Sequence, residues 1–362
     1  MDLELGVTRE REAGSSRFVY TLQAGELHRT FEGTALKTEP GELLYRVTSM
    51  VEGLHRGVGP GRESALKEEI RRRLLALGQD LYRELLPGAL RRTIWPLRGD
   101  VSRVHVRSKE PGISWEMLSP FDDRSGESSD HLAATCVLTR WLPAHGKPPR
   151  KLPAGRILFI DVSEDADGSS RERAALRRLA KRLDVDLTEL DRPTAEEIET
   201  VLSEGGVGIL HASAHGTFET EWADESRLIV NGPRPLRPSD LAGDLRTALR
   251  RDRPMAFFNA CQLGREGWSL TRIGGWAEGF LDCGCSAFIA PAWTVKATLA
   301  SLFAVVFYER LGDGEDLGKA ALEARRATRM EEPDRPSWLA YEVYGHPAAC
   351  LQRATDGAGE DG

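Results

Sequence analysis

Two segments of the chain decide its fold: VGILHASAHG, residues 207–216, and MAFFNACQLG, residues 255–264. Each begins with a short apolar run that suits a buried β-strand. The first run leads into His215, and the second leads into Cys261. If the two strands lie side by side, the histidine and the cysteine meet at one edge of the same sheet even though they are far apart in sequence.

The same pattern of apolar strands alternating with helices extends through most of the chain from Arg156 onward. Strands joined by helices need crossover connections, and these build a parallel sheet with helices on both faces. We therefore predict an α/β fold in which functional residues follow the carboxyl ends of strands. We expect strands at 157–161, 185–190, 207–210, 255–258 and 286–290, and helices at about 174–183, 195–203, 239–249 (with Ser239 as its N-cap), 276–281, 299–311 and 317–329.

Residues upstream of this region show a different pattern. Phe18, Tyr20 and Leu22 alternate, which predicts strands joined by turns over residues 1 to about 60. The glycine-rich stretch 57–61 is predicted to be a flexible joint, and a long amphipathic helix follows it. Its apolar residues recur every three or four positions, at Leu66, Ile70, Leu74, Leu77, Leu81 and Leu85, and Val101, Val104 and Val106 then predict a further strand.

The composition excludes several classes of protein. The chain has 362 residues, of which 40% are hydrophobic and 29% charged, which is ordinary for a packed globular protein. Its net charge of -7 includes no basic block, so nucleic-acid binding is not expected. No apolar run is long enough to span a bilayer, and the first residues lack the order of a secretory signal, so we expect a cytoplasmic protein that does not enter membranes. Its five cysteines are expected to be reduced.

The chemistry of a cysteine nucleophile explains why His215 and Cys261 belong together. A thiol is mostly protonated near neutral pH, and a histidine is the usual group that removes its proton. Gly216 lets the backbone approach a substrate closely, and its N–H together with that of Cys261 suits an oxyanion hole. A single cysteine at the end of an apolar strand is more often a buried core residue. The paired pattern, in this chain order, favours the catalytic interpretation.

These motifs resemble those of the CHAT family, which are caspase-like peptidases of the same broad clan as separases, metacaspases and gingipains. The resemblance covers roughly residues 64–352. It rests on the two segments quoted first and on 77–82 (LGQDLY), 114–118 (SWEML), 138–142 (LTRWL), 275–280 (GWAEGF), 283–287 (CGCSA), 292–295 (AWTV), 307–311 (FYERL) and 344–347 (YGHP).

The resemblance implies a caspase-like, mostly parallel sheet and a cysteine endopeptidase. In that reading His215 is the general acid and base, Cys261 is the nucleophile of an acyl-enzyme, and the amides of Gly216 and Cys261 bind the oxyanion. No cofactor or metal is implied. The substrate is expected to be a protein of the same cell, in a bacterial defence or cell-death pathway, with a gasdermin-like pore former as one candidate and a separate sensor or activator protein as a further partner. We divide the chain into an accessory β region (1–60), a helix-and-strand lead-in (61–150) and a catalytic core (151–355).

The sequence departs from the family after the AWTV step. Many relatives carry an acidic residue there, where a basic P1 side chain binds, whereas this chain has Lys296 and Ala297. If Lys296 lines the specificity pocket, an acidic or small neutral P1 residue is favoured. The alternative is that Lys296 points into solvent. Trp293 is expected either to form a wall of that pocket or to be a core residue.

Other candidate site residues are interpreted as structural. His211 lacks the partners of a metal site and is expected to be a structural histidine. Cys283 and Cys285 are expected to be packing residues, and the acidic group Asp161, Asp165 and Asp167 is expected to be solvated rather than to bind calcium. Two functions compete with the peptidase: a catalytically silent CHAT fold used for binding, and a cysteine hydrolase or transferase that does not cut proteins.

Overall fold

The computed structural model of the chain describes residues 1–12, 15–56, 63–110, 112–163, 166–214, 216–217, 227–260 and 273–352. The strands are β1 (Asp2–Glu12), β2 (Ser15–Ala24), β3 (Leu27–Ala35), β4 (Arg103–Ser108), β5 (Val137–Trp141), β6 (Lys151–Pro153), β7 (Arg156–Asp161), β8 (Leu187–Asp191), β9 (Val207–Ala214), β10 (Gly216–Thr217), β11 (Arg227–Leu228), β12 (Met255–Ala260), β13 (Ala287–Pro291), β14 (Tyr341–Tyr344) and β15 (Cys350–Gln352). The α-helices are α1 (Pro40–Arg56), α2 (Glu63–Leu85), α3 (Gly88–Ile94), α4 (Leu132–Thr135), α5 (Ala166–Leu183), α6 (Ala195–Glu204), α7 (Gly243–Asp252), α8 (Ile273–Asp282), α9 (Ala297–Gly312) and α10 (Leu317–Glu331). None of these helices is long and apolar enough to cross a membrane.

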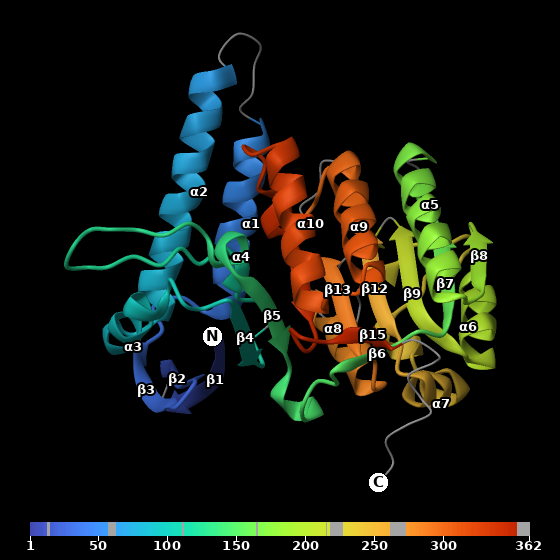
Figure 1. Cartoon of the computed structure of the whole chain (residues 1–362), viewed down its shortest axis with the longest axis horizontal. Coiled ribbons are helices and arrows are strands. Elements are labelled where there is room, and N and C mark those ends of the chain that lie inside the picture. The colour runs from blue at the N-terminus through green and yellow to red at the C-terminus, as the bar shows by residue number, and fades with distance from the viewer. Residues whose placement is uncertain are drawn as a thin grey trace.

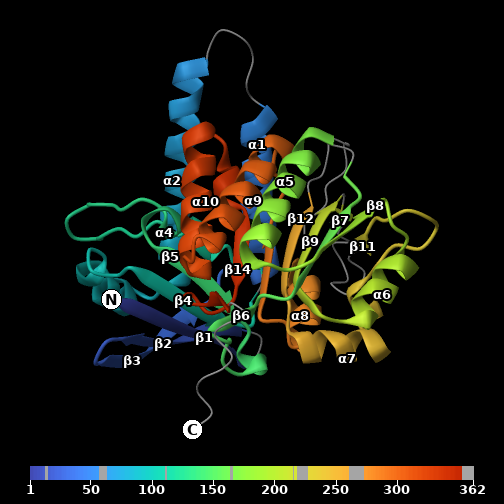
Figure 2. The same ribbon diagram turned by 45° about the vertical axis from the view of Figure 1, so that its right-hand side comes forward.

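One sheet of 11 strands runs through the molecule, in the order β3-β2-β1-β4-β5-β14-β13-β12-β9-β7-β8. Helices α5, α9 and α10 cover one face of its C-terminal half, and α6, α7 and α8 cover the other (Figures 1 and 2). The strands β13, β12, β9, β7 and β8 are parallel to one another. The predicted α/β class, with a mostly parallel sheet flanked by helices, is confirmed.

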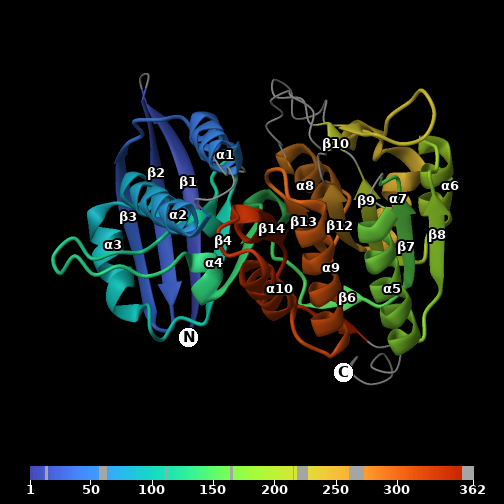
Figure 3. The same cartoon turned by 90° about the horizontal axis from the view of Figure 1, so that it is seen from above.

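The sheet changes direction at β14, which pairs antiparallel with β13 and parallel with β5. Beyond that point β5, β4 and β1 are parallel, and β1, β2 and β3 form an antiparallel meander, seen on the left in Figure 3. The N-terminal strands therefore extend the same sheet. The division of the chain at residues 60 and 150 stays a prediction.

The N-terminal region contains one element that the sequence interpretation missed. Strands occupy this region only to Ala35, and α1 follows as a helix of 17 residues. Leu43, Val47 and Val51 are buried at intervals of four residues, which is helical spacing. The predicted joint at 57–61 lies outside the described residues, and the long helix after it is confirmed as α2.

Several predicted boundaries were wrong; for example, α5 begins at Ala166 rather than near residue 174. The strand predicted at 207–210 continues as β9 to Ala214, and all of its residues are buried. Ser239 does not cap α7: it lies in a 3-10 turn, Pro238–Asp240, in which the Asp240 carboxylate accepts a hydrogen bond from the Arg237 amide. The helix begins after this turn, at Gly243.

The buried histidine of β4 makes stability depend on pH. His105 is 7% exposed, and its Nδ1 lies 2.9 Å from Thr139 Oγ1 on β5. Burial is the main cause that lowers the pKa of His105 to about 3. The unfolded chain takes up this proton near pH 6.5, so the stability contributed by neutral His105 is complete above that pH and is lost as pH falls from about 6.5 toward 3.

We expect His105→Asn to remove that contribution, which for one proton is at most about 1.4 kcal/mol per pH unit below pH 6. Urea unfolding of both proteins at several pH values between 5 and 8 measures it. His28→Asn, at an exposed position of β3, is the matched control. Parallel pH profiles for wild type and His105→Asn would contradict the assignment.

Candidate active site

The ends of β9 and β12 define the candidate site. The two strands are neighbours, and six aligned Cα pairs run from Met255 opposite Ile209 to Ala260 opposite Ala214. His215 and Cys261 are the next residues of the chain after these last partners; both lie outside the described residues. Because the strands are parallel, their carboxyl ends lie at the same edge of the sheet.

A buried polar network lies directly behind these strand ends. His211 of β9 is fully buried, with its Nε2 at 2.8 Å from Glu172 Oε2 and its Nδ1 at 2.9 Å from the hydroxyl of Tyr308. Glu172 comes from α5 and Tyr308 from α9, the two helices that cover this face of the sheet. The ring of His211 also stacks on that of Phe257, its partner on β12, with centroids 5.0 Å apart.

The other oxygen of Glu172 connects the network to β12. Asn259 donates from Nδ2 to Glu172 Oε1 at 2.5 Å, and its own Oδ1 accepts a hydrogen bond from the Tyr341 hydroxyl at 2.7 Å. With a proton on Nε2, the His211 ring donates to Glu172 and accepts from Tyr308 through Nδ1. Every polar side chain of this network then has a partner, which is the condition under which a buried network is stable.

These contacts confirm that His211 is a structural histidine rather than a metal ligand. The sequence interpretation did not identify Glu172, Asn259, Tyr308 or Tyr341 as members of a network. A signal was present for Glu172, which precedes Leu176 by four residues and so lies on the buried stripe of α5. A carboxylate on an apolar stripe requires a buried partner.

Residues after β13 approach the same edge. β13 is parallel to β12, with Ile289 opposite Phe257, so the segment that follows Pro291 leaves the sheet on the side of the candidate site. Trp293 in that segment is 3% exposed. Lys296 is the N-cap residue of α9; its side chain is about half exposed and forms an ion pair with Glu332, just beyond α10.

Gly216 lies in β10 and pairs with Leu228 of β11 in a two-stranded ribbon that follows β9. Gly216 follows His215 directly in the sequence. Among the described residues, its pairing with Leu228 is the structural observation that concerns the predicted oxyanion donor.

The remaining candidates have structural environments. Cys283 and Cys285 are buried, as predicted for packing residues, and burial raises the pKa of both thiols. Asp161 is not merely solvated, because it forms an ion pair with Arg173 at 2.9 Å. Asp165 lies outside the described residues, and in the part of the chain that the structure describes no group of three or more His, Cys, Asp or Glu side chains is arranged to hold a metal ion.

Comparison with solved structures identifies the class of fold. A chain of the Saccharomyces cerevisiae separase–securin complex matches with a TM-score of 0.54 at 10% identity, over 95% of this chain and 30% of that chain. The Arg-specific cysteine proteinase gingipain R matches with a TM-score of 0.49 at 13% identity, over 79% of this chain and 76% of that one. The Drosophila initiator caspase Dronc matches with a TM-score of 0.36 at 8% identity, over 57% of this chain and 85% of that one. Of these three, the separase-complex chain has a TM-score above 0.5, and its fold is similar to that of this chain.

The family follows from the sequence. The CHAT domain model matches residues 144–349, which is more than half of the chain, so the chain belongs to the CHAT-domain family. No curated protein matches the chain. The chain spans about a third of the separase-complex chain that it matches.

The Glu172 carboxylate should be critical for stability. Glu172→Ala leaves His211 and Asn259 without their shared acceptor, and we expect it to lower the free energy of unfolding by about 2–5 kcal/mol. Chemical denaturation measures the change. Glu196→Ala, which removes a side chain that is 65% exposed, is the control and should cost less than about 0.5 kcal/mol. A loss below about 1 kcal/mol for Glu172→Ala would show that the network does not stabilise the fold.

Proposed function

We propose that the chain is a cysteine endopeptidase with Cys261 as its nucleophile and His215 as its general acid and base. The observation that carries this proposal is the register of β9 and β12. Ala214 and Ala260 are lateral partners, and the histidine and the cysteine each follow one of them directly. Two residues that extend aligned neighbouring strands begin close enough to exchange a proton, provided that their side chains turn toward each other.

The reaction follows from the chemistry of these groups. His215 takes the proton of the Cys261 thiol, and the thiolate attacks the carbonyl carbon of the peptide bond. The amides of Gly216 and Cys261 stabilise the oxyanion of the tetrahedral intermediate. The carbon–nitrogen bond then breaks, His215 gives its proton to the leaving amine, and a thioester remains. Water, deprotonated by His215, hydrolyses this acyl-enzyme and restores the thiol.

The buried network supports this assignment from behind the strand ends. Asn259 lies two residues before Cys261, and its side chain is held by Glu172 and Tyr341. His211 lies four residues before His215 and contacts the same carboxylate. Both reacting segments are therefore anchored to one rigid buried group, which limits the movement of the strands that carry them.

The substrate is proposed to be another protein of the same cell. Membership of the CHAT family supports a role in a bacterial defence or cell-death pathway in the cytoplasm, with a gasdermin-like pore former as a candidate substrate and a separate sensor or activator as a candidate partner. A catalytically silent interaction module and a cysteine hydrolase that spares proteins are the alternatives. Both are outcomes of the experiment below.

Cys261→Ala and His215→Ala should each lower peptide cleavage by at least about 10³-fold, because each removes a group that acts in the chemical step. Labelling with a peptide acyloxymethyl ketone measures the reactivity of the thiol, and cleavage of a peptide library by a separate, unlabelled sample measures peptidase activity. Cys350→Ala, which removes an exposed thiol, is the control and should leave both unchanged. Equal labelling of wild type and Cys261→Ala indicates a silent fold, and labelling without cleavage indicates a different hydrolase.

We also propose that Trp293 and Lys296 contribute to the S1 pocket, because both follow the carboxyl end of the strand next to β12. Lys296 then repels a basic P1 side chain. An acidic P1 side chain replaces Glu332 as the ion-pair partner of Lys296.

A library varied at P1 should show cleavage after acidic or small neutral residues. Lys296→Glu should lower cleavage after acidic residues by about tenfold or more, since a like charge replaces the partner. Arg182→Glu, at a surface position about half exposed, controls for net charge. A strong preference of the wild type for Arg or Lys at P1 would refute this assignment.

A further inference from the structure

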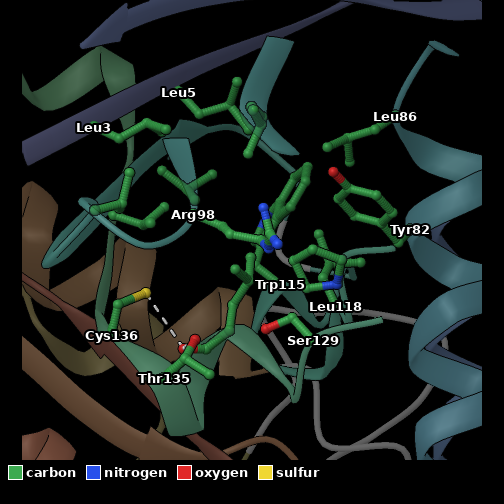
Figure 4. Close-up of a pocket in the computed structure, with 16 residues that line it drawn as sticks. Leu3, Leu5, Tyr82, Leu86, Arg98, Trp115, Leu118, Ser129, Thr135 and Cys136 are labelled. Carbon is green, nitrogen blue, oxygen red and sulfur yellow. Dashed lines mark hydrogen bonds between the residues drawn. The ribbon is translucent and has the colours of Figure 1, made fainter. Parts of the chain in front are cut away.

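A pocket lies in the N-terminal half of the molecule, away from the polar network described above. It is enclosed by the first strand residues of β1 and β4, by α2, and by the 3-10 turn η2 (Trp115–Met117) (Figure 4). Its volume is about 50 Å³. A water molecule needs about 10–15 Å³ and a cavity that binds benzene measures about 150 Å³, so this pocket suits a group smaller than a benzene ring.

The walls of this pocket are apolar. Leu5, Val106, Trp115 and Leu118 line it and are almost completely buried. The rim is open, because Arg98 and Thr135 also line the pocket and are exposed. A small ligand can therefore enter the pocket from solvent.

The apolar lining of the pocket includes one buried hydroxyl without a partner, that of Tyr82. Tyr82 enters from α2, as Figure 4 shows, and is 1% exposed. Among the pocket-lining residues, only Tyr82 has a buried side-chain polar atom without a hydrogen-bond partner. Burial raises the pKa of Tyr82 well above its ordinary value, so this hydroxyl stays protonated and is able to donate.

An unsatisfied buried hydroxyl costs free energy, and an oxygen atom that accepts its hydrogen bond removes that cost. A neighbouring tyrosine shows the usual arrangement: Tyr20 is also buried, and its hydroxyl donates to the carbonyl of Leu85 at 2.5 Å. Tyr82 lacks such a protein partner although it lies beside the same helix end.

The chemistry of the pocket limits the charge of its occupant. The one cationic lining residue, Arg98, already donates to the Trp95 carbonyl at 2.9 Å, stacks on the Trp95 ring and lies 3.6 Å from Glu127. It is also exposed, so it does not require a buried anion. A carboxylate inside apolar walls would lose its hydration without gaining a dedicated partner.

We propose that this pocket is a binding site for a small neutral molecule: a short aliphatic chain of about three carbons with one alcohol or carbonyl oxygen that pairs with the Tyr82 hydroxyl. The site is independent of the proposed peptidase activity. Its ligand is recognised by shape on the apolar walls and by a single hydrogen bond at their centre.

The test uses propan-2-ol as the probe and methyl NMR of the full chain as the readout. We expect saturable shifts of the lining leucine and valine methyl groups with a Kd on the order of 1–10 mM, a range that suits so few atoms. Tyr82→Phe should weaken binding about fivefold, the effect of one neutral hydrogen bond. The matched change Tyr45→Phe, at an exposed tyrosine of α1, should leave the affinity unchanged.

Two further measurements test the proposal. The first compares the Tm of the variants without probe, and the second compares a neutral with a charged probe on the wild-type protein. Without probe, Tyr82→Phe should keep or raise the Tm, whereas Tyr20→Phe, which removes a satisfied hydroxyl, should lower it. Acetate should bind at least about tenfold more weakly than the alcohol, because its charge is not matched in the pocket. Absence of saturable shifts, equal affinity of Tyr82→Phe, or tighter binding of the carboxylate would overturn the proposal.

Discussion

β9 and β12 lie side by side with Ala214 opposite Ala260, and one buried carboxylate, that of Glu172, contacts a side chain of each strand. The backbone ladder sets the register of the two strands, and the carboxylate fixes the distance between their side chains and α5. A one-residue slip of either strand would turn His211 or Asn259 to the opposite face of the sheet and leave Glu172 buried without partners. The buried Glu172 carboxylate therefore enforces the register in which Ala214 and Ala260, the residues before His215 and Cys261, are partners.

A second set of buried charges joins the two halves of the sheet. β5 and β14 share one aligned pair, Tyr344 opposite Arg140. The Arg140 guanidinium compensates for this short ladder: it pairs with Glu116 in η2 and, at 3.0 Å, with Glu342 of β14. Burial raises the pKa of Glu342 to about 7, against the lowering effect of Arg140. Charges in such a place rarely add net stability, but they specify which surfaces meet.

The sequence predicted the elements that have a strong local pattern. The alternation of strands and helices after Arg156 and the apolar period of α2 were sufficient to predict most of the C-terminal half, because buried parallel strands and amphipathic helices have distinct periods. The direction change at β14 could not be predicted, since a four-residue strand carries no signal of its neighbours' direction. The helix α1 was missed although Leu43, Val47 and Val51 have helical spacing, because alternating residues upstream suggested strands for the whole region.

The candidate site could also be predicted only in part from the sequence. His211 and Asn259 lie within the motifs that carry the family resemblance, so the sequence marked their positions but not their partners. Their partners lie far away in the chain: Glu172 in a charged run of α5, Tyr308 within α9 and Tyr341 in β14. No spacing rule relates residues 39, 82 or 97 positions apart, and only the folded sheet brings them together.

β14 connects the buried network with the charges at the sheet junction. Tyr341 and Glu342 are consecutive, so their side chains point to opposite faces of the sheet. The Tyr341 hydroxyl holds Asn259, two residues before Cys261, while Glu342 holds Arg140 and through it Glu116. The Tyr341 carbonyl also accepts a hydrogen bond from buried Arg325 of α10 at 2.9 Å. One short strand supplies all of these contacts, so β14 links the ion pairs of Arg140 on β5 to the hydrogen bond that holds Asn259, two residues before the candidate nucleophile.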